Sequence, residues 1–295
     1  MKRIGDEQTA LVAFVAMSVL AGGNAVAIRY SNRELEPLWG AGLRFALAAA
    51  LLVLLMLALR LRLPRGRALT GAILYGALGI GGAFALAYYA LVRIHAGLGQ
   101  TLLALVPLLT LFLAAVQHQE RVRLRGLVGG VVALAGIAVM SNASLGGDVP
   151  RLSLLAVIGG AACFAEAAIL VRRFPRVHPV AMNAVGMTTG ALLLIAGALA
   201  AHQRPQLPAE AETWLAIGYL VPIGSVLVFV LYVAVLRYWT ASRAAYEFVL
   251  IPVVTVALSA WLDDEPLTAD LILGGLLVLV GVYIGALRSP ASEPV

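Results

Sequence analysis

The residues of this sequence that could do chemistry are a few ionisable side chains inside long apolar stretches. Glu166 is the most central of the acids, and a carboxyl group at that depth can bind a cargo ammonium group or a proton. Its alternative role is a carboxylic acid that is hydrogen-bonded to a neighbouring helix. Glu247 lies close to Arg243 and is expected to join this chemistry or to form an ion pair at the membrane surface. Arg44 is expected either to remain inside or to extend to the outer surface.

Neutral polar residues recur on one face of two apolar segments, one in each half of the chain. Tyr75 and Tyr89 share a helical face in the first segment, and Ser225 and Tyr232 share the matching face in the second. Such a face is expected to line a cavity between two halves, although its glycines could instead serve close helix packing. With the polar residues of other apolar stretches, the candidate substrate contacts are Asn24, Tyr75, Tyr89, Gln100, Thr101, Glu166, Ser225, Tyr232 and Tyr246.

Three prolines fall near the middle of apolar stretches. Pro107, Pro222 and Pro252 each remove a backbone donor and so leave a carbonyl group without its helical partner. Loosened backbone of this kind often lies beside the substrate in transporters, where it can bind cargo or act as a hinge. A simple kink that neighbouring helices tolerate is the alternative. We expect these prolines to be hinge or backbone sites.

No residue pattern predicts covalent or metal chemistry. The four histidines fall at the ends of apolar stretches without metal-ligand spacing, and Cys163 is the only cysteine. We therefore expect no catalytic residue, no metal site, no cofactor and no enzyme activity. The net charge of +6 comes from scattered arginines rather than from a basic patch, so nucleic acid is not an expected partner.

The elements that must position these residues are membrane-spanning helices. With 62% apolar residues and a mean hydropathy of +0.96, the chain has more apolar surface than a soluble core could bury. About 20 apolar residues suffice to cross the hydrocarbon layer of a bilayer. The sequence predicts an all-α membrane protein with ten spans, at 9–28, 38–59, 69–91, 96–116, 124–141, 152–172, 180–201, 213–236, 243–262 and 269–287.

The two halves of the chain are related to each other. Residues 106–110 read Val-Pro-Leu-Leu-Thr, and residues 251–255, at the matching place in the second half, read Ile-Pro-Val-Val-Thr. The register continues to Glu120 and Glu265 and to paired glycines beyond them. We expect two five-helix repeats, at 1–147 and 148–295. Because five is an odd number of spans, the second repeat must be inverted relative to the first.

The arginines predict the orientation. Placing both termini in the cytoplasm puts most of the 21 basic residues on the cytoplasmic side, as the positive-inside rule requires. The first apolar stretch also has the order of basic, apolar and small residues of a cleavable signal peptide. Its removal would leave one repeat a helix short, so we expect it to remain.

The ten spans, the inverted five-plus-five repeat, the paired Pro107 and Pro252 and the paired Glu120 and Glu265 together resemble the EamA branch of the drug/metabolite transporter superfamily. In its general plan the chain is similar to bacterial exporters of aromatic and other amino acids in that branch. The resemblance implies a central cavity walled by spans one to four and six to nine, with spans five and ten as supports. The two prolines and two glutamates that match the repeated motif are expected to be structural.

We therefore expect a multi-pass transporter in a bacterial inner membrane that exports small metabolites, foremost neutral or aromatic amino acids, by alternating access. Proton-coupled efflux of drugs or other amphipathic metabolites is the alternative, with H⁺ as an additional partner. An intramembrane enzyme and a non-transporting membrane partner are readings from other classes, and the sequence favours neither. Besides the small-molecule substrate and the lipid bilayer no partner is expected, and the monomer is the favoured state.

Overall fold

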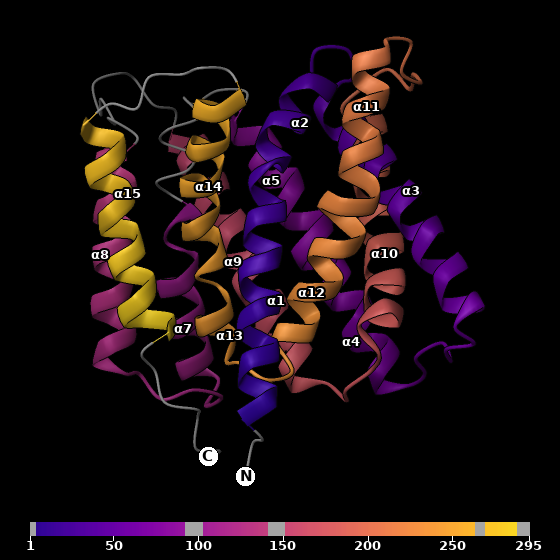
Figure 1. Ribbon diagram of the computed structural model, residues 1–295. Helices are drawn as coiled ribbons and strands as arrows, with labels where there is room; N and C mark the ends of the chain where they lie inside the picture. The colour runs from indigo at the N-terminus through magenta and orange to yellow at the C-terminus, as the bar shows by residue number, and fades with distance from the viewer. Residues whose placement is uncertain (1–3, 92–102, 141–150, 263–268, 288–295) are drawn as a thin grey trace.

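The computed structural model describes residues 4–91, 103–140, 151–262 and 269–287. Within these ranges every regular element is a helix, and the helices stand side by side as one bundle (Figure 1). The described chain begins and ends at the same end of the bundle (Figure 1). The all-helical class expected from the sequence is thus confirmed.

In the first half of the chain the helices are α1 (Ile4–Gly22), α2 (Asn24–Ser31), α3 (Pro37–Ala58), α4 (Arg67–Gly76), η1 (Ala77–Gly82), α5 (Ala83–Leu91), α7 (Val106–Val116) and α8 (Leu124–Met140). In the second half they are α9 (Arg151–Arg173), α10 (Pro179–Ala200), α11 (Ala211–Tyr219), η2 (Leu220–Leu227), α12 (Val228–Val235), α13 (Ala241–Ala244), α14 (Glu247–Leu262), α15 (Ala269–Val282) and η3 (Tyr283–Leu287).

Six helical stretches among the described residues are long and apolar enough to cross a bilayer. Their outer faces are apolar as well: Leu54 of α3 is 63% exposed, and Leu215 of α11 is 76% exposed. Exposed leucine within long apolar helices indicates that lipid, not water, surrounds the bundle. Shorter apolar helices lie at 106–116, 124–139 and 272–287.

Local signals set where several helices begin and end. Pro37 and Pro179 stand in the first turns of α3 and α10, where a proline loses no hydrogen bond. Arg60, His118 and His202 follow the ends of α3, α7 and α10 with φ of 51°, 56° and 55°. In each case the residue and its successor donate to carbonyl groups of the last turn, which stops the helix. Two of the four histidines thus end helices.

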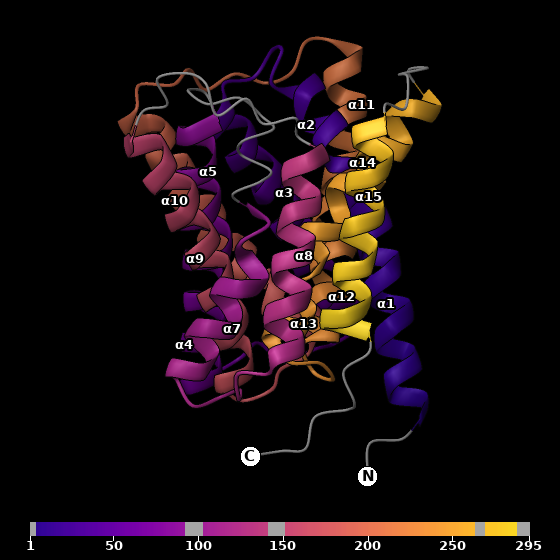
Figure 2. The ribbon, with the colours of Figure 1, turned by 90° about the vertical axis from the view of Figure 1, so that its left-hand side faces the viewer.

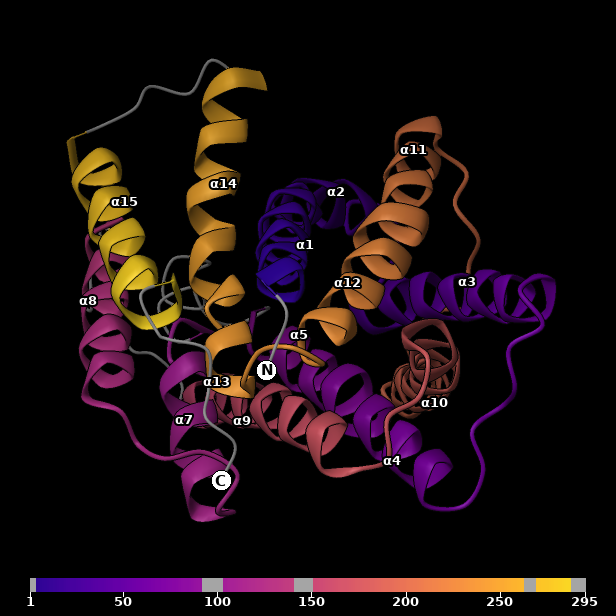
Figure 3. The ribbon, with the colours of Figure 1, turned by 60° about the horizontal axis from the view of Figure 1, so that its bottom comes forward.

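The helices pack in pairs around a central group. Helix α8 packs along α15 (Figure 2), and α3 packs along α10. Seen along the bundle, these two pairs lie on opposite sides, with α1, α5, α9 and α12 between them (Figure 3). Among the central helices α9 contacts α5 and α7, whereas α1 contacts α12 and α14.

Close approach of glycines makes the pair of α8 with α15 and η3 tight. A Cβ atom on Gly129 would lie 2.6 Å from the backbone nitrogen of Gly285 and 2.7 Å from the carbonyl oxygen of Gly281. Only small residues permit backbones to come this near. Gly129 of α8 and Gly281 and Gly285 of the second span therefore form a packing seam.

Two π-helical segments, η1 and η2, interrupt long helices at matching places. They begin at Ala77 and Leu220, corresponding positions of the two halves, and each continues directly into an α-helix. A π-helical turn adds a residue and so rotates every side chain beyond it relative to those before it. The stripe expected from regular helical spacing is therefore broken, and Gly79 and Gly82 face α9, at Ala167 and Cys163.

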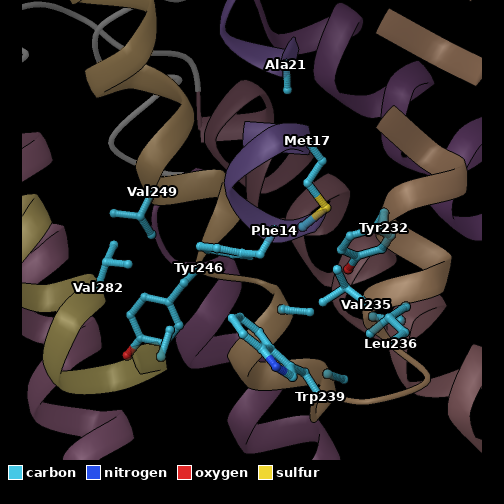
Figure 4. Close-up of a cluster of buried hydrophobic side chains, with 14 of the residues drawn as sticks. Phe14, Met17, Ala21, Tyr232, Val235, Leu236, Trp239, Tyr246, Val249 and Val282 are labelled. Atoms are coloured by element: carbon cyan, nitrogen blue, oxygen red, sulfur yellow. The ribbon is translucent and has the colours of Figure 1, made fainter. Parts of the chain in front are cut away.

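A buried cluster joins α1 to the end of the bundle at which the chain starts. Phe14 of α1 lies against Trp239, with ring centroids 5.0 Å apart, and Met17 and Tyr232 pack beside them (Figure 4). Tyr246 belongs to the same cluster and is 2% exposed. This cluster fixes α1 against α12 and α14.

Candidate functional site

A row of phenylalanine rings crosses the interior from α3 to α14. Phe45 of α3 lies 4.8 Å from Phe84 of α5, Phe84 lies 5.6 Å from Phe164 of α9, and Phe164 lies 5.0 Å from Phe248 of α14, all as centroid distances. Phe45 is fully buried, whereas the other three are only half-buried although they pack against one another. The row therefore borders accessible space, and its flat apolar faces can receive an aromatic or aliphatic group.

Arg44 lies beside one end of this row. Its guanidinium group is 5.0 Å from the Phe45 ring centroid, and the residue is 3% exposed. Nε donates to Oγ of Ser225 at 2.7 Å, and Nη2 donates to the carbonyl oxygen of Gly224 at 2.9 Å. Arg44 therefore stays inside the bundle and does not extend to the outer surface.

Asn24 shares an acceptor with Arg44. Its Nδ2 donates to the carbonyl oxygen of Gly224 at 3.2 Å, so one carbonyl group joins α2, α3 and η2. Any Cβ at position 224 would lie 2.0 Å from Oδ1 of Asn24. The glycine lets these helices meet, and two predicted contacts, Asn24 and Ser225, fall in one polar cluster with Arg44.

Glu247 is a second buried ionisable group, nearer the opposite end of the bundle. It is 6% exposed, and its Oε2 has no hydrogen-bond partner within the described part of the chain. Arg243 does not pair with it. That arginine binds Glu7 of α1 instead, at 2.6 Å. The interfacial pair of Glu247 with Arg243 is therefore absent, because a partner distant in sequence takes the arginine.

The phenols of Tyr75 and Tyr232 lie near Glu247. The hydroxyl group of Tyr75 donates to Oδ1 of Asn183 at 3.0 Å, and Nδ2 of Asn183 donates to the carbonyl oxygen of Phe229. Both tyrosines are buried. They form a polar group between α4, α10 and α12, separate from the cluster around Arg44.

Four other predicted contacts lie elsewhere. Tyr246 donates its hydroxyl hydrogen to the carbonyl oxygen of Gly126 at 2.9 Å, which ties α8 to the start of α14. Tyr89 is 38% exposed at the end of α5. Gln100 and Thr101 lie outside the described residues.

Glu166 is half-buried and accepts a hydrogen bond from Nε2 of Gln117 at 2.6 Å. The bond joins α9 to the end of α7, which matches the alternative role of a carboxyl group bonded to a neighbouring helix. Nearby, Gln117, Gln119, Arg172 and Arg173 line an open pocket of about 440 Å³. This pocket lies at the end of the bundle where α7 and α9 terminate.

At the same end, hydrogen bonds join the ends of α7 and α9 to the segment between α12 and α14. Glu120, after α7, accepts from the backbone nitrogen and the hydroxyl group of Ser242 in α13. Arg172 of α9 donates to the carbonyl groups of Leu236 and Trp239, beyond α12. Any cargo that enters between these segments must break such contacts.

The prolines differ in position. Pro107 stands in the first turn of α7, which begins at Val106 after a turn at residues 104–105 that follows the helical residue Leu103. Pro252 lies inside α14, and Pro222 lies inside η2, where it is exposed. A break in the helical backbone thus lies directly before Pro107, whereas Pro252 and Pro222 lie within helices.

At the opposite end, the loop before α3 is bonded to the loop before α11. The hydroxyl group of Thr213 and the backbone nitrogen of Ala209 donate to Glu34 and hold the pKa of its carboxyl group below the ordinary value. Glu34 also accepts from Glu210 through the backbone. Among the described residues no group of His, Cys, Asp and Glu has the arrangement of a metal site.

The model of the EamA-like transporter family matches this chain twice, at residues 8–142 and 151–286. The chain belongs to the EamA-like transporter family. It is therefore a membrane transporter and not an enzyme. EamA-type transport implies a small-molecule substrate.

Curated relatives are similar over nearly their whole length. An uncharacterized transporter of Archaeoglobus fulgidus is 29% identical over 92% of this chain and 96% of its own. The uncharacterized inner membrane transporter YedA of Escherichia coli is 30% identical over 92% and 91%. A probable amino-acid metabolite efflux pump of Escherichia coli is 27% identical over 90% and 91%. A protein of known crystal structure aligns with a TM-score of 0.80 at 21% identity, over 95% of this chain and 97% of that one, and so shares its fold.

Sequence reasoning named Asn24 and Ser225 but missed the aromatic row. Phe84 and Phe164 look like ordinary lipid-facing or core residues in an apolar helix, and their mutual contact joins segments that are far apart in the sequence. No local signal marks them. Arg44 was visible as a charge in a span, but which way it points depends on an acceptor in η2.

Proposed function

We propose that this EamA-type transporter exports small amphipathic solutes, and that amino acids with neutral or aromatic side chains are its cargo. The observation that carries the proposal is the row of half-buried rings from Phe84 through Phe164 to Phe248. Flat apolar faces suit such side chains. The buried polar groups beside the row, Arg44 and Glu247, can orient a charged main-chain end. The name of one relative, a probable amino-acid metabolite efflux pump, agrees with this cargo.

Transport then proceeds by alternating access between residues 1–147 and 148–295, arranged as inverted repeats. Two observations support this. The family model matches once in each half, and the π-helical segments η1 and η2 recur at matching places in the two halves. The bonds of Glu120 to Ser242 join the two halves at one end in the described state. Their opening would admit cargo to the aromatic row.

We place the protein in a bacterial inner membrane with both termini in the cytoplasm. The excess of arginines on that side supports this orientation. So does the shared end of the bundle at which the described chain starts and stops (Figure 1). The pocket lined by Arg172 and Arg173 would then open to the cytoplasm, on the side from which an exporter takes cargo.

The test is counterflow in liposomes that contain only the purified protein. Vesicles loaded with unlabelled phenylalanine or leucine should accumulate labelled phenylalanine transiently and with saturation, whereas empty liposomes should not. A panel with polar amino acids, sugars and organic cations defines the cargo. If none of the amino acids is transported or bound, the proposed cargo class is wrong, even if another solute moves.

Proton-coupled efflux is a second candidate because of one observation. Glu247 is buried with an unpartnered oxygen atom among the described residues, and such an acid inside a membrane protein can exchange a proton during transport. The groups that act on it are the phenols of Tyr75 and Tyr232. Glu247→Gln should then abolish the pH dependence of flux. Glu166→Gln should preserve it, because the carboxyl group of Glu166 is already bonded to Gln117. Flux that never depends on pH would exclude this candidate.

A further inference from the structure

Arg44 carries a charge that the described protein does not balance. It lies two turns into α3, about 10 Å below the start of the span. The ion pairs of the described residues are Arg33 with Glu212 and Arg243 with Glu7, and neither involves Arg44. The ionisable groups that act on it are the phenols of Tyr88 and Tyr219. Within the described ranges, a guanidinium group in the membrane interior therefore faces only neutral partners.

The guanidinium group also has spare donors. Nε and Nη2 are bound to Ser225 and Gly224, whereas Nη1 donates to no atom of the residues described here. Nη1 is not one of the fully enclosed atoms that lack a partner. The residue keeps 3% of its surface exposed, and Nη1 is its terminal nitrogen without a protein acceptor in the described ranges.

A purely structural role does not require this residue. A glutamine at position 44 could donate to a carbonyl group and accept from a hydroxyl group, and so join α3 to η2 without bringing a charge into the bilayer. A guanidinium group that keeps its positive charge and has N–H donors without protein acceptors is suited to bind a carboxylate. The neighbouring Phe45 ring continues into the aromatic row, so a ligand held at Nη1 can lay its apolar part along Phe84.

We propose that Arg44 is the carboxylate-binding group of the transport site, and that the cargo class is defined by a carboxylate attached to an apolar or aromatic body. Ser225 and the Gly224 carbonyl hold the guanidinium group in place while Nη1 engages the anion. This inference rests on the proposed function and makes it narrower. Under this inference, binding requires the carboxylate of an amino acid and depends less on the ammonium group of that amino acid. Organic cations of the same shape are excluded.

Competition on the wild-type protein tests this without any substitution. Counterflow of labelled phenylalanine is measured with a large excess of phenylpropionate, which keeps the carboxylate, or of phenylethylamine, which keeps only the amine. Phenylpropionate should inhibit strongly, and phenylethylamine should leave most of the flux. Equal inhibition by the two compounds would overturn the role of Arg44.

Substitutions test whether the preference for carboxylates depends on Arg44. Arg44→Gln should lower the affinity for phenylalanine at least tenfold and remove inhibition by phenylpropionate, and Arg44→Lys should restore part of both. Arg33→Gln, at an exposed arginine, is the matched control and should change neither. Each variant is compared with wild type by its melting temperature in detergent, so misfolding is recognised separately. An Arg44→Gln protein that folds and still prefers carboxylates would overturn the proposal.

The failure of the two proposals can be told apart. If amino acids are transported but amines compete as well as carboxylates, the inference about Arg44 fails and the proposed function stands. If amino acids are not transported but phenylpropionate binds in an Arg44-dependent manner, the proposed function fails and the carboxylate site stands. Binding of phenylpropionate is followed by tryptophan fluorescence of the purified protein.

Discussion

Replacing Gly76 by alanine tests how the helix that carries η1 is held. Gly76 ends α4, and a Cβ atom there would lie 2.1 Å from the carbonyl oxygen of Gly186 in α10, with two more backbone atoms within 2.6 Å. Real Cβ atoms essentially never approach closer than 3.0 Å, so α4 and α10 must separate by about 0.9 Å. Backbone atoms cannot rotate away as a side chain can.

Two effects of opposite sign decide how much Gly76→Ala changes the free energy of unfolding. Alanine gains about 0.5–1 kcal/mol over glycine inside a helix, and Gly76 already has helical angles, φ −68° and ψ −40°. Overpacking of a tight contact costs roughly 1–3 kcal/mol. The steric effect should win, because all three nearest atoms are backbone. Gly218→Ala is the matched control, since its Cβ would meet nothing within 4 Å, and it should be neutral or slightly stabilising.

The assay is the melting temperature of the purified variants in detergent, read by the loss of monodisperse protein on heating. Gly76→Ala should melt several degrees below Gly218→Ala, since 1 kcal/mol corresponds to roughly 2–4 °C in a protein of this size class. A Gly76→Ala protein that melts at or above the temperature of Gly218→Ala would refute the close packing of α4 on α10.

Further predictions concern cargo contacts and pH. Phe84→Ala should raise KM for phenylalanine roughly two- to thirteenfold, since an aromatic contact contributes about 0.5–1.5 kcal/mol. Phe112→Ala, at a ring that is 63% exposed on α7, should leave KM unchanged in the same counterflow assay. If both variants behave alike, the row does not contact cargo. Glu34 has a pKa below its ordinary value because Thr213 and Ala209 donate hydrogen bonds to it. These bonds therefore stabilise the folded protein fully when the pH is above the ordinary pKa of a glutamate. Their contribution is lost as the pH falls through the lowered pKa. The wild-type melting temperature should therefore fall more steeply between about pH 5 and pH 3 than that of Glu34→Gln. Parallel curves would show that these bonds do not favour the ionised carboxylate.

Hydropathy alone predicted the helical class and the position of the long spans, because a lipid-exposed helix must be apolar along its whole length. It could not predict η1 and η2, since a π-helical turn changes hydrogen bonding without changing composition. Pro107 was expected to interrupt a helix, and a turn at residues 104–105 separates Leu103 from α7 directly before it. Whether a proline breaks or begins a helix depends on where the preceding turn ends, and apolar sequence does not mark that point.

Charges within spans were recognised, but their partners were not. Glu247 and Arg243 are one helical turn apart and looked like an ion pair, yet Arg243 binds Glu7, at the other end of the sequence. Arg44 could extend to water at the outer surface or form hydrogen bonds inside the bundle. The carbonyl group of Gly224 provides an acceptor for the bonds inside. Contacts between segments from opposite halves of the chain depend on helix packing, which one sequence does not encode in any local pattern.

The central claim is that the aromatic row borders a water-filled path that opens to each side in turn. Thiol accessibility tests it most directly, with Phe164→Cys in a Cys163→Ser background and a membrane-impermeant methanethiosulfonate reagent applied from either side of the membrane. The account predicts that the cysteine reacts from both sides, that phenylalanine slows the reaction, and that the lipid-facing control Leu54→Cys stays unreactive. A cysteine at position 164 that reacts from neither side, in a protein that still folds, would contradict it.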